Sequence, residues 1–100
     1  MKKRQINIDE LISFLGDEVV RIYGDIHGVY IDNLADVEHV NETTLDWIKP
    51  KNPSKQTIVE KSLARVILVD EEIKPVQGKV LIVVKHPKMA LAKVGNQFFV

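Results

Sequence analysis

The sequence predicts an α/β (α+β) fold, a single domain in which about three helices pack on a small mixed β-sheet. Two segments, residues 66–69 and 80–84, are entirely apolar, which is typical of strands buried on both faces. Segments with helical spacing of apolar residues lie before and after these strands, and this order favours helices packed on a sheet. A chain of 100 residues forms one domain and buries roughly two-thirds of its unfolded surface.

The first predicted element is a helix over residues 8–15. Its apolar residues follow the i, i+3, i+4, i+7 spacing of one helix face: Ile8, Leu11, Ile12 and Leu15. Asn7 or Asp9 can cap its start, and Gly16 is placed to end it.

Three short strands are predicted next. Residues 19–22 form the first strand, which the Gly24-Asp25 pair closes. Residues 28–34 contain the β-formers of a second strand, residues 35–44 form an irregular connection, and residues 45–48 form the third strand.

A second helix is predicted after the Asn52-Pro53 pair. Asn52 is a favourable N-cap, and Pro53 fits the next position because its missing N–H has no partner there in any helix. This helix presents Ile58, Val59 and either Ser62 or Leu63 to the core.

A charged surface loop over residues 70–79 and a third helix complete the predicted elements. His86-Pro87 opens this helix, in which Pro87, Leu91, Val94 and Phe98 recur at spacings of four, three and four.

The chain stops at Phe98-Phe99-Val100. We expect either that this apolar end packs into the core or that the natural protein continues beyond it as a longer chain.

The composition narrows the class of function. Fourteen acidic residues balance fourteen basic ones, so no net field attracts nucleic acid or anionic lipid. No apolar run approaches the roughly 20 residues of a membrane span, and the charged start lacks the apolar core of a secretory signal. There is no cysteine, hence no disulfide framework. We therefore expect a cytoplasmic, globular domain without a membrane span or a nucleic-acid partner.

The loop around the only tryptophan carries the chemistry that points to a ligand. Trp47 offers an aromatic face, Asn52 offers a bidentate amide, and three ammonium groups lie nearby: Lys49, Lys51 and Lys55. These groups can hold a base and its phosphates but cannot break a bond. The sequence contains no other constellation typical of an active site, so we predict no catalytic residue, no metal site and no cofactor in this chain.

The segment Gly24-Asp25-Ile26-His27-Gly28 matches the GDxHG box that opens the metallophosphatase fold, in which Asp and His ligate one of two metals. A two-metal site needs many more ligands, and the later GDxxDRG and GNHE boxes of that family do not occur here. We therefore interpret the segment as a turn in which Asp25 and Gly28 supply the special dihedral angles.

The order of elements resembles the N-terminal domain of UDP-3-O-acylglucosamine N-acyltransferases over about residues 6 to 99. The resemblance rests on the first helix, the Gly24-Asp25 turn, and the segments NLADVEHVNETTLDWI, NPSKQ, ARVILV and LIVVKHPKMALAKV. It implies recognition of the uridine part of a UDP-linked acylated amino sugar. It also implies a left-handed β-helix of hexapeptide repeats after Val100, which carries the catalytic His, binds acyl carrier protein and forms a homotrimer. The whole protein would then transfer a hydroxyacyl chain to the sugar amine in lipid A biosynthesis, and we expect the 100-residue chain alone to be a monomer.

The resemblance assigns substrate-binding roles to three residues. Trp47 stands at the position of the aromatic residue that stacks on uracil, and Asn52 at that of the Asn that binds the uracil edge, with a two-residue insertion at residues 49–51. Lys55 replaces a second stacking aromatic, usually Tyr. One wall of the base sandwich is therefore absent, although a lysine can still contact the base or a phosphate. An alternative is a structural or interaction module that has kept the fold and lost the nucleotide.

Overall fold

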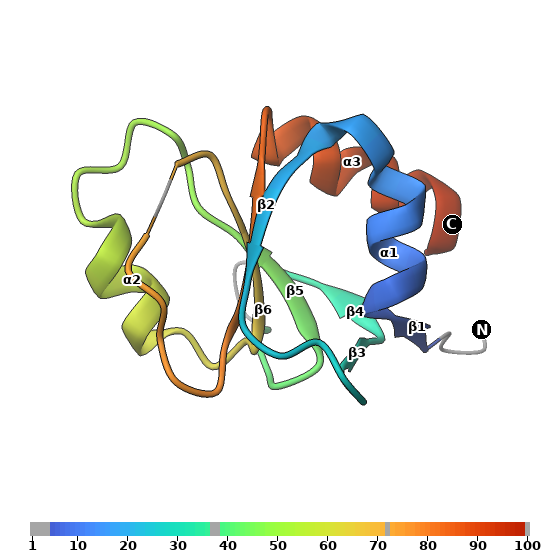
Figure 1. The fold of residues 1–100 in the computed structure, drawn as a ribbon, viewed down its shortest axis with the longest axis horizontal. Coiled ribbons are helices and arrows are strands. Elements are labelled where there is room, and N and C mark those ends of the chain that lie inside the picture. Colours follow the sequence, from blue (N-terminus) through green and yellow to red (C-terminus); the bar gives the residue numbers. More distant parts are fainter. Residues whose placement is uncertain (1–4, 37–38, 72, 100) are drawn as a thin grey trace.

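A five-stranded mixed sheet in the order β2-β7-β6-β5-β4 forms the centre of the molecule. The computed structural model in Figure 1 describes residues 5–36, 39–71 and 73–99. The strands of this sheet are β2 (Val19–Tyr23), β4 (Asn33–Leu34), β5 (Thr44–Trp47), β6 (Val66–Val69) and β7 (Val80–Val84). β2 runs antiparallel to β7, whereas β7, β6, β5 and β4 are parallel to one another. A separate antiparallel pair joins β1 (Ile6–Asn7) to β3 (Tyr30–Ile31).

Helices cover both faces of the sheet. Figure 1 shows α1 (Ile8–Leu15) and α3 (Pro87–Phe98) on one face and α2 (Lys55–Lys61) on the other. Successive side chains of a strand point to opposite faces. In β6 and β7, Leu68 and Ile82 accordingly join the core under α1 and α3, whereas Ile67 and Leu81 join the core under α2. The predicted α+β fold in a single domain is therefore confirmed.

Several predicted elements are confirmed at their expected places. α1 spans the predicted residues and ends at Gly16, whose φ of 53° is accessible mainly to glycine. All residues of β6 and β7 are buried, as their apolar sequences predicted. α3 begins at Pro87, which follows His86 at the N-cap position. The residues that the structure describes include no helix long and apolar enough to cross a membrane.

The prediction of one strand over residues 28–34 is wrong. This segment divides into β3, which pairs with β1, and β4, which pairs with β5 in the large sheet. The two pairings run in opposite senses, because β1 and β3 are antiparallel whereas β4 and β5 are parallel. The chain changes sheets at Asp32, whose Oδ1 accepts hydrogen bonds from Asn33 Nδ2 at 2.7 Å and Thr43 Oγ1 at 2.8 Å.

The second helix begins later than predicted. Its first residue is Lys55 and its N-cap is Ser54, so Asn52 and Pro53 precede the helix. Asn52 nevertheless stabilises this start, because its Oδ1 accepts a hydrogen bond from the Ser54 N–H at 2.8 Å. Val59 of this helix is fully buried, as predicted, whereas Leu63 lies beyond the helix and is 68% exposed.

Gly24 should be the least replaceable glycine of the fold. Its φ is 102°, and a Cβ atom added to it would lie 2.3 Å from the Lys79 carbonyl oxygen. Gly24→Ala should therefore lower the free energy of unfolding by about 2 kcal/mol or more, because a disfavoured backbone and a clash act together. Chemical denaturation followed by circular dichroism measures this loss.

The matched control is Gly78→Ala. Gly78 also has a positive φ, 81°, but an added Cβ would meet nothing within 4 Å. This variant isolates the backbone contribution, so equal losses in the two variants would show that the close approach to Lys79 is unimportant.

Candidate ligand-binding groove

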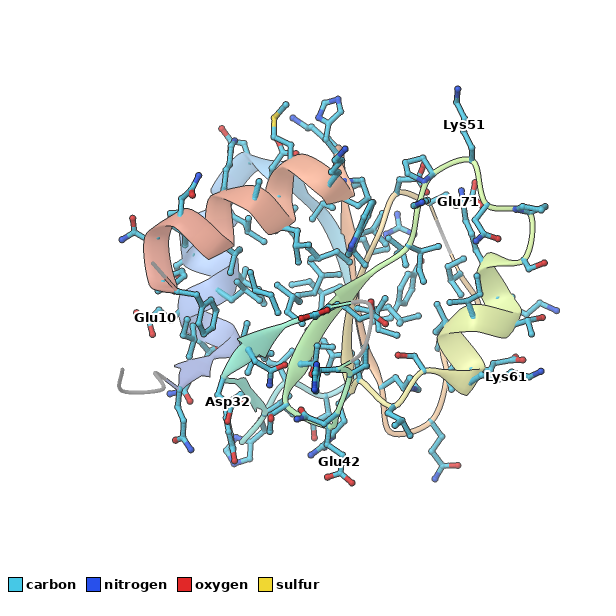
Figure 2. The ribbon with its side chains drawn as sticks, turned by 180° about the vertical axis from the view of Figure 1, so that it is seen from behind. Glu10, Asp32, Glu42, Lys51, Lys61 and Glu71 are labelled. Atoms are coloured by element: carbon cyan, nitrogen blue, oxygen red, sulfur yellow. The ribbon has the colours of Figure 1, made fainter. Side chains whose placement is uncertain are left out.

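One groove of about 960 Å³ lies at the carboxyl ends of the parallel strands. Three segments line it: the end of β5 with the loop after it, the residue after β6, and the turn from β7 with the first part of α3. We call it the strand-end groove, and its lining residues are Trp47, Lys49, Pro50, Lys51, Asp70, Lys85, His86, Pro87, Lys88, Met89 and Ala92. In sheets with parallel strands, ligands generally bind outside the carboxyl ends of the strands. Figure 2 shows Lys51 and Glu71 at this end of the molecule and Glu42 at the other.

Trp47 forms part of both the core and the groove. It is the last residue of β5, is half-buried, and packs against the core under α1 and α3. Its backbone N–H donates to Asp46 Oδ1 at 2.8 Å, and Asp46 Oδ2 accepts from Ser62 Oγ at 2.9 Å. These bonds fix the end of β5, so the indole has a defined place beside the groove.

The groove concentrates positive charge in a chain whose formal net charge is zero. Four lysines line it (Lys49, Lys51, Lys85 and Lys88), and all four are exposed. Within the described part of the chain, none of them forms an ion pair with a protein carboxylate. Their ammonium groups therefore remain available to an anion. The remaining walls include apolar side chains, among them Pro50, Met89 and Ala92.

His86 anchors the turn between β7 and α3. Its backbone N–H donates to Glu18 Oε1 at 3.2 Å, and its Nδ1 lies 3.5 Å from the same oxygen. The Lys85 N–H also donates to the Glu18 carbonyl oxygen at 3.1 Å. Glu18 is the last residue of a 3-10 turn (Gly16–Glu18) before β2, and this turn thus holds the α3 side of the groove in place.

Of the three predicted site residues, only Trp47 lines the groove. Asn52 lies outside the lining, and its Oδ1 already accepts the Ser54 N–H. Lys55 is 8% exposed, and its Nζ lies 2.9 Å from Asp70 Oδ1 and 3.1 Å from Glu71 Oε1. Lys55 therefore lies outside the lining, and it contacts the groove through its ion pair with Asp70, which lines the groove.

The Lys55 ion pairs should make the stability of the protein sensitive to alkali. The hydrogen bond to Asp70, followed by that to Glu71, raises the pKa of Lys55 above 10.5, although burial opposes this shift. A raised folded-state pKa gives stability that is complete below the unfolded-state pKa and is lost as pH rises through the folded-state value. Lys55→Met should thus be less stable than the wild type at pH 7, and the difference should shrink above about pH 10.5.

Urea unfolding of both proteins from neutral to strongly alkaline pH checks this expectation, with Trp47 fluorescence as the signal. Lys61→Met is the matched control, because Lys61 is exposed in the last turn of the same helix. A stability difference between wild type and Lys55→Met that stays constant at alkaline pH would contradict the assignment.

The GDxHG segment lies at the other end of β2 and β7 and forms the predicted turn. Gly24 and Gly28 have positive φ values, 102° and 72°. The expectation that Asp25 supplies a special dihedral is wrong, since no described residue other than glycine has a positive φ. Asp25 instead accepts the His27 N–H at 2.9 Å on Oδ1. Among the residues described, no group of three or more His, Asp or Glu side chains could hold a metal ion.

Sequence reasoning missed the α3 side of the groove. Lys85, Lys88 and Met89 were not predicted as site residues, and His86 was interpreted mainly as the start of a helix, with a ligand role as the less favoured alternative. A signal was available, because segments that follow neighbouring parallel strands meet at one edge of the sheet. Asp70 was likewise assigned to a solvated loop, but it borders the groove.

Comparison with known proteins adds no assignment. No protein-family model matches this chain, and no curated protein is significantly similar to it.

Proposed function

We propose that the strand-end groove recognises the uridine diphosphate part of a UDP-linked acylated amino sugar. The observation that carries this proposal is the placement of the Trp47 indole in one groove with four lysines that form no ion pair within the described part of the chain. An aromatic face stacks on a base, and ammonium groups attract a diphosphate. The position outside the carboxyl ends of parallel strands supports the same proposal.

The groove is suited to a ligand of this composition in two further respects. α3 begins at the groove, and its first backbone N–H groups carry partial positive charge that favours a phosphate. The apolar side chains of Met89 and Ala92 can contact the less polar parts of the same ligand.

Asn52 would act from outside the lining. Its Oδ1 already accepts one hydrogen bond, whereas no hydrogen bond from its amide nitrogen is described. That nitrogen can donate one hydrogen bond to a uracil carbonyl oxygen. The sequence suggested a bidentate contact with two hydrogen bonds, so the proposed contact is the smaller one. In the proposed whole protein, acyl transfer from acyl carrier protein belongs to the hexapeptide-repeat domain and this chain supplies recognition.

The burial of Lys55 favours a second candidate, an interaction module that has lost the nucleotide. Lys55 stands where the resemblance expects a second aromatic wall, and its charge is committed to Asp70 and Glu71. Among the described residues that line the groove, Trp47 is the only Phe, Tyr or Trp, so base stacking would be weaker than in a clamp formed by two such side chains.

Titration of Trp47 fluorescence separates the two candidates. Uridine monophosphate (UMP) and UDP-N-acetylglucosamine should quench it saturably, with excitation at the red edge of the tryptophan band, where uracil does not absorb. Inorganic pyrophosphate supplies charge without a base, and uridine supplies a base without charge, so each should bind more weakly. Lys51→Gln should weaken binding of the UDP-sugar, whereas the control Lys93→Gln, on the same helix as Lys88 but outside the groove, should not. No quenching at millimolar uridine ligand would favour the interaction module.

A further inference from the structure

Asp70 is a carboxylate placed among the lysines of the strand-end groove. It directly follows β6, and its side chain is 22% exposed. Its Oδ1 accepts a hydrogen bond from Lys55 Nζ at 2.9 Å. Its second carboxylate oxygen, Oδ2, forms no hydrogen bond with the described residues. If Oδ2 were buried it would be a buried oxygen without a partner, and the described part of the chain contains no such atom. The second oxygen is therefore accessible and free to accept a hydrogen bond from a ligand.

Lys55 fixes the orientation of this carboxylate. Lys55 is the first residue of α2, and its side chain is 9% exposed. Its ammonium group bridges the carboxylates of Asp70 and Glu71. One ammonium group between two carboxylates leaves a net negative charge at this point. A ligand phosphate is repelled from it, whereas a hydroxyl or N–H donor is attracted.

A nucleotide stacked on Trp47 offers such donors on its ribose. A carboxylate near the carboxyl end of a parallel strand is the arrangement that binds ribose hydroxyls in doubly wound nucleotide-binding sheets. In this groove the lysines suit the phosphates and the indole suits the base, so the ribose is the part of the nucleotide left for Asp70.

We propose that Asp70 accepts a hydrogen bond from the ribose 2′-hydroxyl of the bound nucleotide, and that Lys55 is the positioning residue that holds Asp70 for this contact. This inference rests on the proposed function. It makes Asp70 the residue that distinguishes ribonucleotides from deoxyribonucleotides, a role that neither the sequence pattern nor the resemblance assigned to it.

The test compares UMP with 2′-deoxy-UMP by Trp47 fluorescence in the wild type and in Asp70→Asn. The wild type should bind UMP about tenfold more tightly than 2′-deoxy-UMP, the equivalent of one hydrogen bond to a charged group. In Asp70→Asn the preference should fall towards one, through weaker binding of UMP. Glu42→Gln, a carboxylate-to-amide change at the opposite end of the molecule, should keep the wild-type preference.

Lys55 variants test the positioning role. Lys55→Met should lose most of the ribose preference, and Lys55→Arg should retain it, whereas a merely structural role would alter binding of both nucleotides equally. The unliganded fluorescence spectrum of Trp47 shows whether each variant is folded.

Other outcomes would overturn the inference in distinguishable ways. An unchanged preference in Asp70→Asn, or equal weakening of both nucleotides, would exclude the ribose contact and leave nucleotide binding intact. Loss of discrimination against N3-methyl-UMP instead would assign Asp70 to the base N–H. Failure of the wild type to bind any of these nucleotides would overturn the proposed function together with the inference.

Discussion

Trp47→Leu should weaken UMP binding about tenfold or more, because base–aromatic stacking contributes roughly 1–3 kcal/mol per base. Leucine keeps an apolar side chain against the core under α1 and α3 but removes the aromatic face from the groove. Since Trp47 is only half-buried, the accompanying loss of stability should be smaller than the roughly 3–5 kcal/mol of a fully buried aromatic. Calorimetric titration measures the affinity, because the substitution removes the only tryptophan.

Two control variants sharpen this prediction. Trp47→Phe should retain most of the affinity, since it restores an aromatic face at the same place. Phe14→Leu removes an aromatic ring that packs edge-on to Phe98 at a centroid distance of 5.2 Å, outside the groove, and should leave the affinity unchanged. If Trp47→Leu bound UMP like the wild type but lost stability, Trp47 would be a core residue without a ligand role.

The largest effect on folding is expected at Ile82. This side chain is fully buried in β7, which pairs with β2 on one side and β6 on the other. Ile82→Ala should lower the free energy of unfolding by about 2–5 kcal/mol, the sum of the lost transfer energy and the cavity left behind. This is a large part of the roughly 5–15 kcal/mol that stabilises an ordinary domain.

Denaturant unfolding measures the loss at Ile82, and Val20→Ala is the control. Val20 is 60% exposed on the neighbouring strand β2, so its truncation should change stability by no more than about 0.5 kcal/mol. Similar losses in the two variants would show that the described core does not dominate the stability of this domain.

The parts of the fold that depend on local pattern could be predicted from the sequence. The runs in β6 and β7 are apolar on both faces because α1 and α3 cover one face and α2 covers the other. The spacing of Ile8, Leu11 and Leu15 likewise matches the buried stripe of α1. In both cases the pattern of apolar residues within the element itself shows which of its faces are buried.

The parts that depend on remote partners could not be predicted. The break between β3 and β4 follows from pairing with Ile6 on one side of Asp32 and with Thr44 and Leu45 on the other. A period of two looks the same whichever strand lies alongside it. The start of α2 was misplaced for a different reason. Asn52 accepts a hydrogen bond from the backbone N–H two residues later, and an Asn can do this both in a turn and at a helix N-cap, so the sequence alone does not distinguish the two.

The candidate site was predicted only in part, because some of its residues come from segments that are remote in the sequence. Trp47, which lines the groove, could be singled out because it is a lone tryptophan in a lysine-rich segment of the sequence. The opposite wall comes from residues 85–92, some forty positions further along the chain, and only the parallel order of β5, β6 and β7 places it beside Trp47. Lys55 was expected to reach the ligand, but Asp70, which comes after the next strand, binds its ammonium group.

An amide-resolved NMR titration of the chain with UMP tests the central claim most directly, that the strand-end groove is a nucleotide site. We predict saturable shifts concentrated at Trp47, at residues 49–51, at Asp70 and at residues 85–89, with no comparable shifts at Asp25 and His27 in the smaller pocket at the opposite end of the sheet. Shifts concentrated in that smaller pocket, or no saturable shift in the groove at millimolar UMP, would contradict the account.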